Sequence, residues 1–272
     1  MFNLMRLKKK LISDFNKNGL IVLPKILTVK KVKSIKSKIT NILKKIEKKN
    51  NSLNNLKGIN AEAQAIHNLH NKDFEFVKLL SNKTILYFVE KLLKESTYLN
   101  SEDIICQKSF ARNPSFNKKK QMLHTDSRFI SSSKPLTINV FWLVDDFNEL
   151  NGALRYVPGS HKFLRFPKNN VKYRNEKIIK ALKGDVIIFD GNVWHGNAKK
   201  LKNFDRWVVA FRYSPWFYRP SFLNEYNTPT SIYKKLSDKE KVLLGFKHIS
   251  PKDEFERIES RSKNFYKPVG SF

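Results

Sequence analysis

The stretch Gln121-Met-Leu-His-Thr-Asp-Ser-Arg-Phe-Ile130 places His124 and Asp126 two positions apart in a segment that we predict to be a strand. In a β-strand, side chains i and i+2 lie on the same face, so an imidazole nitrogen and a carboxylate oxygen can converge on one point. One more histidine completes a 2-His-1-carboxylate set, which holds Fe(II) and leaves coordination positions open. The pattern His-x-Asp is weak evidence alone, because a turn histidine beside an acidic cap has the same spacing.

His195 is the candidate for the third ligand. It follows the apolar run Lys183-Gly-Asp-Val-Ile-Ile-Phe-Asp190, which predicts a buried strand, and a tight turn through Gly191 and Asn192. This context places an imidazole at the rim of a barrel strand, where a ligand from a second sheet is needed. The alternative is a histidine that is hydrogen-bonded within the turn.

Arg206 begins the run Arg-Trp-Val-Val-Ala-Phe-Arg212, in which strand alternation puts Arg206 and Val208 on one face. A guanidinium on an inward face is costly unless it is paired. A dicarboxylate co-substrate supplies such a partner through a bidentate carboxylate–guanidinium bridge. The alternative is an arginine at the strand end that pairs with Asp205 or faces solvent.

The hydrophobic pattern predicts helices first and short strands afterwards. Val32, Ile35 and Ile39, for example, recur at helical spacing beside a lysine-rich face. The expected helices cover residues 4–17, 28–46, 61–70 and 73–94, and the expected strands cover 20–24, 104–111, 121–126, 136–144, 152–157, 185–190 and 206–213. This order favours a mainly β fold with flanking helices, a barrel or jelly roll.

We expect one domain over residues 1–272. Its parts are a mostly helical N-terminal part over 1–100, a jelly-roll core over 101–214 and a C-terminal segment over 215–272 that wraps the barrel. A chain of 272 residues with 40% hydrophobic and 12% aromatic residues is long and apolar enough to form a globular core. The absence of a long apolar run predicts no membrane span, and the lone Cys106 fits a reducing cytoplasm.

The formal net charge of +29 is large, but Lys is spread along the whole chain among Asn and Ile. No basic cluster with interleaved aromatic residues stands out, so we expect a composition bias and no nucleic-acid partner. The surplus of cations favours a small-molecule substrate that is anionic. The oligomeric state is left open by the sequence.

The ordered set of His-x-Asp, a later His and then Arg resembles the iron(II)/2-oxoglutarate-dependent oxygenases, and within them the phytanoyl-CoA dioxygenase (PhyH-like) family. The segment Asn151-Gly-Ala-Leu-Arg-Tyr-Val-Pro-Gly-Ser-His161 is similar to a family segment that ends in Pro-Gly-Ser-His. Phe15-Asn-Lys-Asn-Gly-Leu-Ile-Val-Leu-Pro24 resembles the family's N-terminal opening, and Lys183–Asp190 precedes the distal histidine as in the family. The resemblance covers essentially the whole chain.

The resemblance implies a double-stranded β-helix, the cupin-like jelly roll. It implies that His124, Asp126 and His195 are the catalytic Fe(II) ligands and that 2-oxoglutarate is the co-substrate. Arg206 would clamp the distal carboxylate of 2-oxoglutarate, with further contacts from Trp142 and Asn197; core packing or turn chemistry explains these two equally well.

The resemblance also implies a reaction. Dioxygen would be consumed, with ascorbate as a supporting reductant, and succinate and carbon dioxide would be the co-products of hydroxylation of a small organic substrate. Arg112 lies near a basic position of the family, in a loop that differs from it. The carboxylate of Asp126 favours hydroxylation, because halogenating relatives lack a carboxylate there.

Two other functions stay open at this point. One is an AlkB-like nucleic-acid or protein demethylase on the same scaffold, since Arg206 and Arg212 have the spacing of the paired arginines in those enzymes. Val208 and Ala210, however, occupy the places where those enzymes carry Asn and Thr. The other is a non-catalytic cupin-type binding protein that kept the fold, against which the complete ligand set argues.

Overall fold

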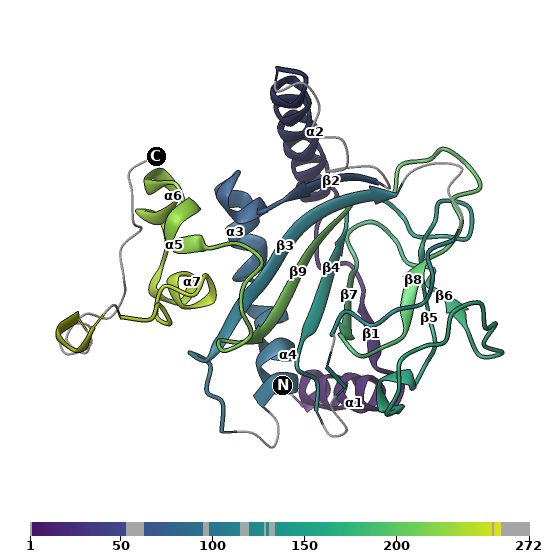
Figure 1. The fold of residues 1–272 in the computed structure, drawn as a ribbon. Helices are drawn as coiled ribbons and strands as arrows, with labels where there is room; N and C mark the ends of the chain where they lie inside the picture. The colour runs from purple at the N-terminus through teal and green to yellow at the C-terminus, as the bar shows by residue number, and fades with distance from the viewer. Residues whose placement is uncertain are drawn as a thin grey trace. The chain divides into compact units, whose positions relative to one another are not determined.

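The computed structural model describes residues 2–52, 63–94, 98–114, 120–127, 129–130, 134–251 and 253–256 (Figure 1). The chain divides into two compact units. The first unit consists of Met1–His67 and Phe110–Ala210, and the second consists of Asn68–Ser109 and Phe211–Phe272. The division of the chain into one domain with three parts stays a prediction.

Two antiparallel sheets carry the β-structure. The larger sheet has the strand order β1-β7-β4-β9-β3-β2 and the smaller sheet has the order β6-β5-β8. The strands of the larger sheet are β1 (Leu20–Leu23), β2 (Ala63–His67), β3 (Ile104–Pro114), β4 (Ile138–Leu143), β7 (Val186–Asp190) and β9 (Val208–Pro215). The smaller sheet contains β5 (Leu154–Tyr156), β6 (Lys177–Ile178) and β8 (His195–Asn197). The expected mainly β fold with flanking helices, a jelly roll, is confirmed.

The core of the first unit draws residues from both sheets. On β7 the side chains of Ile187 and Phe189 belong to this core, while Val186 and Ile188 point to the opposite face and are also fully buried. The core cluster consists of Leu20, Phe141, Leu143, Phe147, Ala153, Leu154, Ile179, Ile187, Phe189, Val208 and Ala210. Burial on both faces explains why the sequence of β7 is continuously apolar.

Helices α1 (Phe2–Asn18) and α2 (Val29–Ser52) also belong to the first unit and confirm the helices expected at 4–17 and 28–46. Ile35 and Ile39 of α2 are fully buried, whereas Lys30, Lys33 and Lys44 on its other face are exposed. The amphipathic pattern of the sequence therefore separates a core-facing side from a solvated lysine side.

The second unit contains short helices. They are the 3₁₀ turn η1 (Leu69–Asn71), α3 (Phe74–Leu80), α4 (Lys83–Lys94), α5 (Asn224–Asn227), α6 (Thr230–Tyr233) and α7 (Asp238–Leu243). The single helix expected at 73–94 is two helices, because the chain turns at Ser81 and the side chain of Asn82 accepts the N–H of Ile85 at the start of α4. The side chain of Asp73 caps α3 by accepting the N–H of Glu75 at 2.8 Å.

The helix expected at 61–70 is wrong where the structure describes it. Ala63–His67 forms β2, which pairs with β3 in the register Ala65 to Arg112. The segment is short, and the neighbouring strand satisfies its main-chain groups, so pairing overrides local helix preference. The strand expected at 121–126 is reduced to an isolated bridge at His124. The expected C-terminal wrap lies partly outside the described residues.

His67 and His70 lie in different surroundings. His67 lies on β2, whereas His70 is buried between the Ser109 hydroxyl at 2.8 Å and Asn224 Oδ1 at 2.9 Å. No helix in the described part of the chain has the length and apolar character needed to cross a membrane.

Candidate metal centre and its cavity

His124 and His195 lie side by side because their main chains pair. Each N–H donates to the other residue's carbonyl, with N···O distances of 2.9 and 3.0 Å, which makes an isolated antiparallel bridge. Gly196 permits the approach, since a Cβ atom there would lie 3.0 Å from the carbonyl oxygens of Gln121 and Met122. Two segments that are far apart in the sequence are thereby held in one short ladder.

Asp126 is positioned by the turn that follows β7. The N–H of Asp126 donates to the carbonyl of Gly191 at 2.8 Å, and the N–H of Ser127 donates to the same oxygen at 3.1 Å. Gly191 itself is packed against Thr137, whose Oγ1 would be 1.9 Å from a Cβ at this position. The turn predicted at Gly191 and Asn192 thus supplies the carbonyl oxygen that holds the main chain at Asp126.

Hydrogen bonds fix which nitrogen each imidazole can offer to a metal. His124 Nδ1 lies 3.1 Å from the Met122 carbonyl oxygen, and His195 Nδ1 lies 2.8 Å from the Val193 carbonyl oxygen. A carbonyl oxygen only accepts, so each Nδ1 carries the proton and each Nε2 presents a lone pair. Histidines that bind a metal through one ring nitrogen usually donate the N–H of the other nitrogen to such an acceptor.

The ligand atoms of the three residues converge. His124 Nε2 is 4.0 Å from Asp126 Oδ1, and His195 Nε2 is 3.5 Å from Asp126 Oδ2. One ligand atom from each of the three lies within 4.8 Å of the other two. The side chain of His195 is 5% exposed and that of His124 is 38% exposed, so the group is closed on one side and open on the other.

Arg206 is a buried cation in the same unit, with 1% of its surface exposed. Its Nη2 donates to Asn197 Oδ1 at 2.9 Å, and its guanidinium carbon lies 4.6 Å from the centre of the Phe147 ring. Burial, together with the nearby charge of Arg112, lowers the pKa of Arg206 to about 9. Its Nε is buried without a hydrogen-bond partner among the described residues, so the guanidinium is short of an acceptor.

One cavity connects the three-residue cluster with the arginine. Its lining residues are Phe110, Arg112, Gln121, His124, Asp126, Phe141, Leu154, His195, Asn197, Arg206 and Val208. The structure therefore brings together five of the six residues singled out by the sequence: the two histidines, the aspartate, the arginine and Asn197. A cavity lined by three candidate metal ligands and by a guanidinium suits a chelating dicarboxylate.

Trp142 is not among the described residues that line this cavity. Its neighbour Phe141 lines the cavity, and successive side chains of a strand point to opposite faces, so Trp142 lies on the other face of β4. Its indole Nε1 is buried without a partner in the described part of the chain. Contact between Trp142 and a co-substrate stays a prediction.

Comparison with known proteins identifies the family to which the chain belongs. The family model described as "Phytanoyl-CoA dioxygenase (PhyH)" matches residues 15–203. The chain belongs to the phytanoyl-CoA dioxygenase family. An uncharacterized protein of Mycobacterium tuberculosis is 20% identical over 196 residues, which is 72% of this chain and 69% of that protein. The dioxygenase ALT11 of Alternaria alternata is 32% identical over 108 residues, 39% of this chain and 35% of its own.

Solved structures agree with the phytanoyl-CoA dioxygenase fold. HygX from Streptomyces hygroscopicus, crystallised with nickel, 2-oxoglutarate and hygromycin B, has a TM-score of 0.59 and 16% sequence identity. The match covers 81% of this chain and 89% of HygX, and at this identity it shows the fold alone. The family and its dioxygenase relatives make the chain an iron(II)- and 2-oxoglutarate-dependent dioxygenase.

The family's Pro-Gly-Ser-His segment has a structural role in this chain. The Ser160 hydroxyl accepts the N–H of Trp194, next to His195, at 2.8 Å. The N–H of Gly159 donates to the Asn18 carbonyl at 3.0 Å, and His161 Nε2 lies 3.3 Å from the Asn16 carbonyl oxygen. The turn therefore links the end of α1 to the strand of the distal histidine, and His161 is engaged there. Arg128, a cation in the same stretch of sequence as His124 and Asp126, lies outside the described residues.

Gln121 and Asn113 are functional candidates that sequence reasoning missed. Gln121 lines the cavity, and its Oε1 accepts the N–H of Asn197 at 3.2 Å. Asn113 hydrogen-bonds to the main chain of Arg206. Neither belongs to a recognisable motif, and only the alternation of Phe110 and Arg112 along β3 indicates which face of that strand meets the cavity.

Proposed function

We propose that the enzyme hydroxylates a small organic substrate, with His124, Asp126 and His195 as the ligands of Fe(II). Arg206 and Asn197 then hold the distal carboxylate of 2-oxoglutarate. The observation that supports this most is the buried guanidinium, still short of an acceptor, in the cavity that the three-residue cluster also lines.

The donor set fits Fe(II). Two neutral imidazoles and one carboxylate are the ligand types of non-haem iron sites that keep open positions. Both Nδ1 atoms are hydrogen-bonded to main-chain carbonyls, so metal binding through Nε2 needs no change of tautomer. The half-exposed edge of His124 leaves room for further ligands on that side.

The residues at the other end fit a carboxylate. A guanidinium binds a carboxylate with two parallel N–H···O bonds, and Arg206 has one donor engaged by Asn197 and a buried Nε that needs an acceptor. The guanidinium carbon lies over the Phe147 ring, 4.6 Å from its centre, so this ring supports the cation on one side. Arg112 adds a second cation to the same cavity, which supports an anionic co-substrate or substrate.

When bound, iron and 2-oxoglutarate supply the oxidising chemistry that inserts an oxygen atom from dioxygen into a C–H bond, releasing succinate and carbon dioxide. The protein contributes position and shielding. Phe110, Phe141, Leu154 and Val208 give the cavity an apolar part of its lining, which would shield the reacting atoms from water. Ascorbate is proposed as a supporting reductant.

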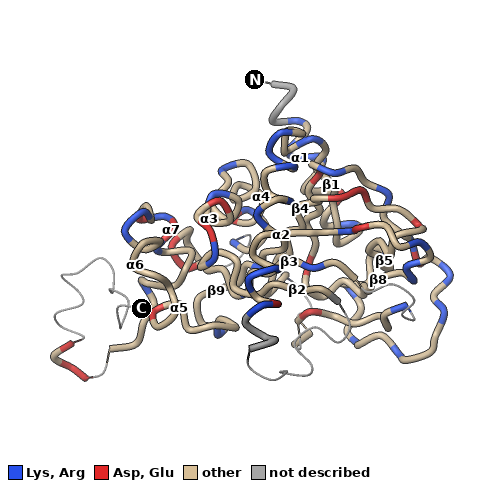
Figure 2. Tube along the Cα trace, turned by 90° about the horizontal axis from the view of Figure 1, so that it is seen from above, with Lys and Arg blue, Asp and Glu red and all other residues tan. Residues whose placement is uncertain are grey.

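The charge distribution does not favour the demethylase alternative with a nucleic-acid substrate. Helix α2 is rich in Lys, but Lys and Arg also occur along the rest of both units, which is what a bias in composition produces (Figure 2). We therefore place the substrate among small molecules, with an anionic group where it approaches Arg112.

Formation of succinate in a screen of small metabolites, with Fe(II), ascorbate and 2-oxoglutarate present, tests this function. Asp126→Ala should lower turnover by more than about 100-fold, because it removes an iron ligand. Asp238→Asn, at a carboxylate whose side chain is 77% exposed, is the matched control and should behave like the wild type.

Three outcomes would contradict the proposal. Undiminished turnover of Asp126→Ala would remove the ligand assignment. Formaldehyde release from methylated oligonucleotides or peptides, without hydroxylation of any small molecule, would point to a demethylase. Binding of 2-oxoglutarate without any succinate formation would point to a binding protein.

A further inference from the structure

Asn113 lies near the end of β3, opposite Gln64 of β2, and is 5% exposed. Its side chain makes hydrogen bonds with both of its polar atoms. Oδ1 accepts the N–H of Arg206 at 3.0 Å and the Lys200 ammonium at 3.3 Å. Nδ2 donates to Gln64 Oε1 and to Asp205 Oδ1, each at 3.1 Å. A single buried amide thus joins β2, β3 and the segment that carries Arg206.

The side-chain oxygen of Asn113 accepts the main-chain N–H of Arg206 and so fixes the backbone at that residue. Arg206 precedes β9, which begins at Val208, so its N–H is not part of that strand. The bond from Asn113 holds the Arg206 backbone at the point where its side chain enters the cavity. Small errors in this backbone are multiplied along a long side chain, so the position of the guanidinium depends on this contact.

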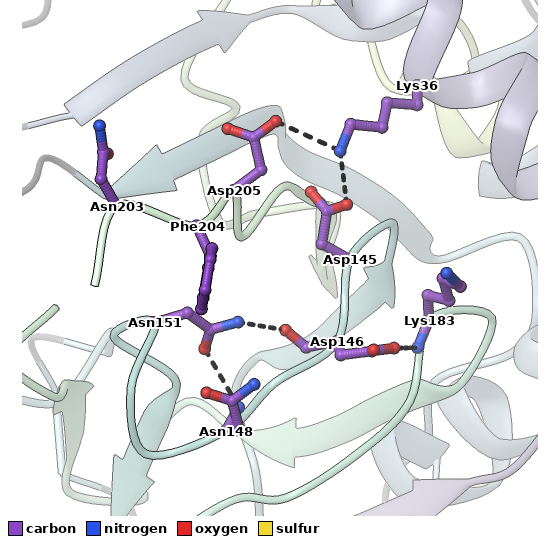
Figure 3. A pocket seen from close by; sticks show the side chains of 9 residues that line it. All are labelled: Lys36, Asp145, Asp146, Asn148, Asn151, Lys183, Asn203, Phe204 and Asp205. Atoms are coloured by element: carbon purple, nitrogen blue, oxygen red, sulfur yellow. Dashed lines mark hydrogen bonds and ion pairs between the residues drawn. The ribbon is translucent and has the colours of Figure 1, made fainter. Parts of the chain in front are cut away.

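The side-chain amide nitrogen of Asn113 donates a hydrogen bond to the carboxylate of Asp205. Asp205 is adjacent to Arg206 in the chain and is a potential ion-pair partner for the guanidinium. Its Oδ1 is bound by Asn113, and its Oδ2 lies 3.2 Å from the Lys36 ammonium. Lys36 also pairs with Asp145 at 2.6 Å, and Figure 3 shows its ammonium between the two carboxylates.

These contacts lie beside a second, polar cavity of about 520 Å³, which Lys36, Asp145 and Asp205 line together with Asn203 (Figure 3). The two carboxylates on this side are engaged with Lys36 and Asn113, while the guanidinium of Arg206 pairs with no described carboxylate. The cation on the other side of Asn113 is thereby left available for an external anion.

We propose that Asn113 is a positioning residue for the co-substrate clamp, which orients Arg206 and holds the Asp205 carboxylate away from it. This inference rests on the proposed role of Arg206 in binding 2-oxoglutarate. It requires both a donor and an acceptor at position 113. Aspartate has the same shape and keeps the acceptor, but it cannot donate to Asp205 and it adds a negative charge beside Arg206.

The test is the affinity for 2-oxoglutarate, measured by calorimetry without oxygen in protein loaded with Mn(II). Asn113→Asp is the main variant and Asn113→Ala the second. Asn203→Asp is the matched control, because it adds the same charge to an exposed residue of the same polar cavity. We expect the Kd for 2-oxoglutarate to rise at least tenfold in both Asn113 variants and to stay within twofold in the control.

The affinity for Mn(II) should stay within twofold in all variants, which separates a positioning effect from general damage to the fold. In turnover, the KM for 2-oxoglutarate should rise more than kcat falls. A folded Asn113→Asp protein with wild-type affinity for 2-oxoglutarate would overturn the inference. Arg206→Ala tests the proposed role of Arg206 separately from that of Asn113. If Arg206→Ala also binds 2-oxoglutarate with wild-type affinity, the proposed clamp itself is wrong.

Discussion

His124 and His195 exchange both of their main-chain hydrogen bonds across a single antiparallel bridge, and their ring centres are 4.5 Å apart. The spacing of the two imidazoles is therefore set by backbone pairing as well as by side-chain rotamers. Substitutions that separate the two segments should act on metal binding even when they leave every ligand in place.

Gly196→Val should weaken metal binding. A Cβ at this position meets the carbonyl oxygens of Gln121 and Met122 at 3.0 Å, and branching adds bulk against main chain that cannot rotate away. We expect the Kd for Mn(II) to rise about tenfold or more, a change of about 1.4 kcal/mol. Titration followed by the electron paramagnetic resonance of free Mn(II) measures it, and an unchanged Kd would show that the two segments can separate without cost.

Glu176→Ala should destabilise the protein, because Glu176 pairs at 2.8 Å with Arg155, whose side chain is 4% exposed. Removing one partner of a buried pair leaves an uncompensated charge and costs about 3 kcal/mol. Replacing both residues by methionine should recover most of that loss. Urea denaturation of the single and double variants decides this, and a double variant as unstable as Glu176→Ala would contradict it.

Asp190 should make stability fall as the pH rises. Burial raises the pKa of this carboxyl to about 7 in the folded chain, from an ordinary value of 3.8. Between these two pKa values the folded state holds a proton that the unfolded state has lost. The contribution of Asp190 to the free energy of unfolding is therefore fully present below pH 3.8 and is lost as the pH rises towards 7. Between pH 5 and pH 8 the loss should be about 2 to 3 kcal/mol.

Asp190→Asn removes this pH dependence and keeps the side-chain oxygen that accepts the N–H of Asn192. Free energies of unfolding at pH 5 and pH 8 measure the difference between variant and wild type. Equal pH dependence in both proteins would mean that Asp190 is ionised throughout this range.

His70 should stay neutral well below the pH at which most histidines titrate. Burial lowers the pKa of His70 to about 4. A histidine whose folded pKa is depressed stabilises the fold above its ordinary value of 6.5, and this stabilisation is lost as the pH falls from 6.5 towards 4. Nitrogen chemical shifts of the imidazole follow the titration, and a midpoint near 6.5 would contradict the burial seen in the structure.

Local patterns predicted the parts of the fold that depend on local physics. The helical spacing of Ile35 and Ile39 lies within one element, and so does the apolar run of β7 between its flanking turn residues, so both were recognisable in the sequence. The segment 63–67 was not, because it becomes a strand only through pairing with β3, and that pairing is a long-range event.

In the candidate site, too, local patterns predicted some features, while others depend on contacts between distant parts of the chain. Alternation correctly placed Arg206 and Val208 on one face, and the structure brings His124, Asp126 and His195 together. The means differ from the expectation, since Asp126 is held by the carbonyl of Gly191 and not by a continuous strand. The role of Asn113 could not be predicted, because its contact with Arg206 joins residues 93 positions apart.

The turn at Gly159 and Ser160 joins the end of α1 to the residue before His195. The residues that form or support the proposed iron and co-substrate site are thus distributed from Asn18 to Arg206 along the chain. During synthesis on the ribosome, the nascent chain has no finished pocket until Arg206 has emerged. We therefore expect the complete site to form late, and a version of the enzyme that lacks its first helix should keep every proposed ligand yet bind metal and co-substrate poorly.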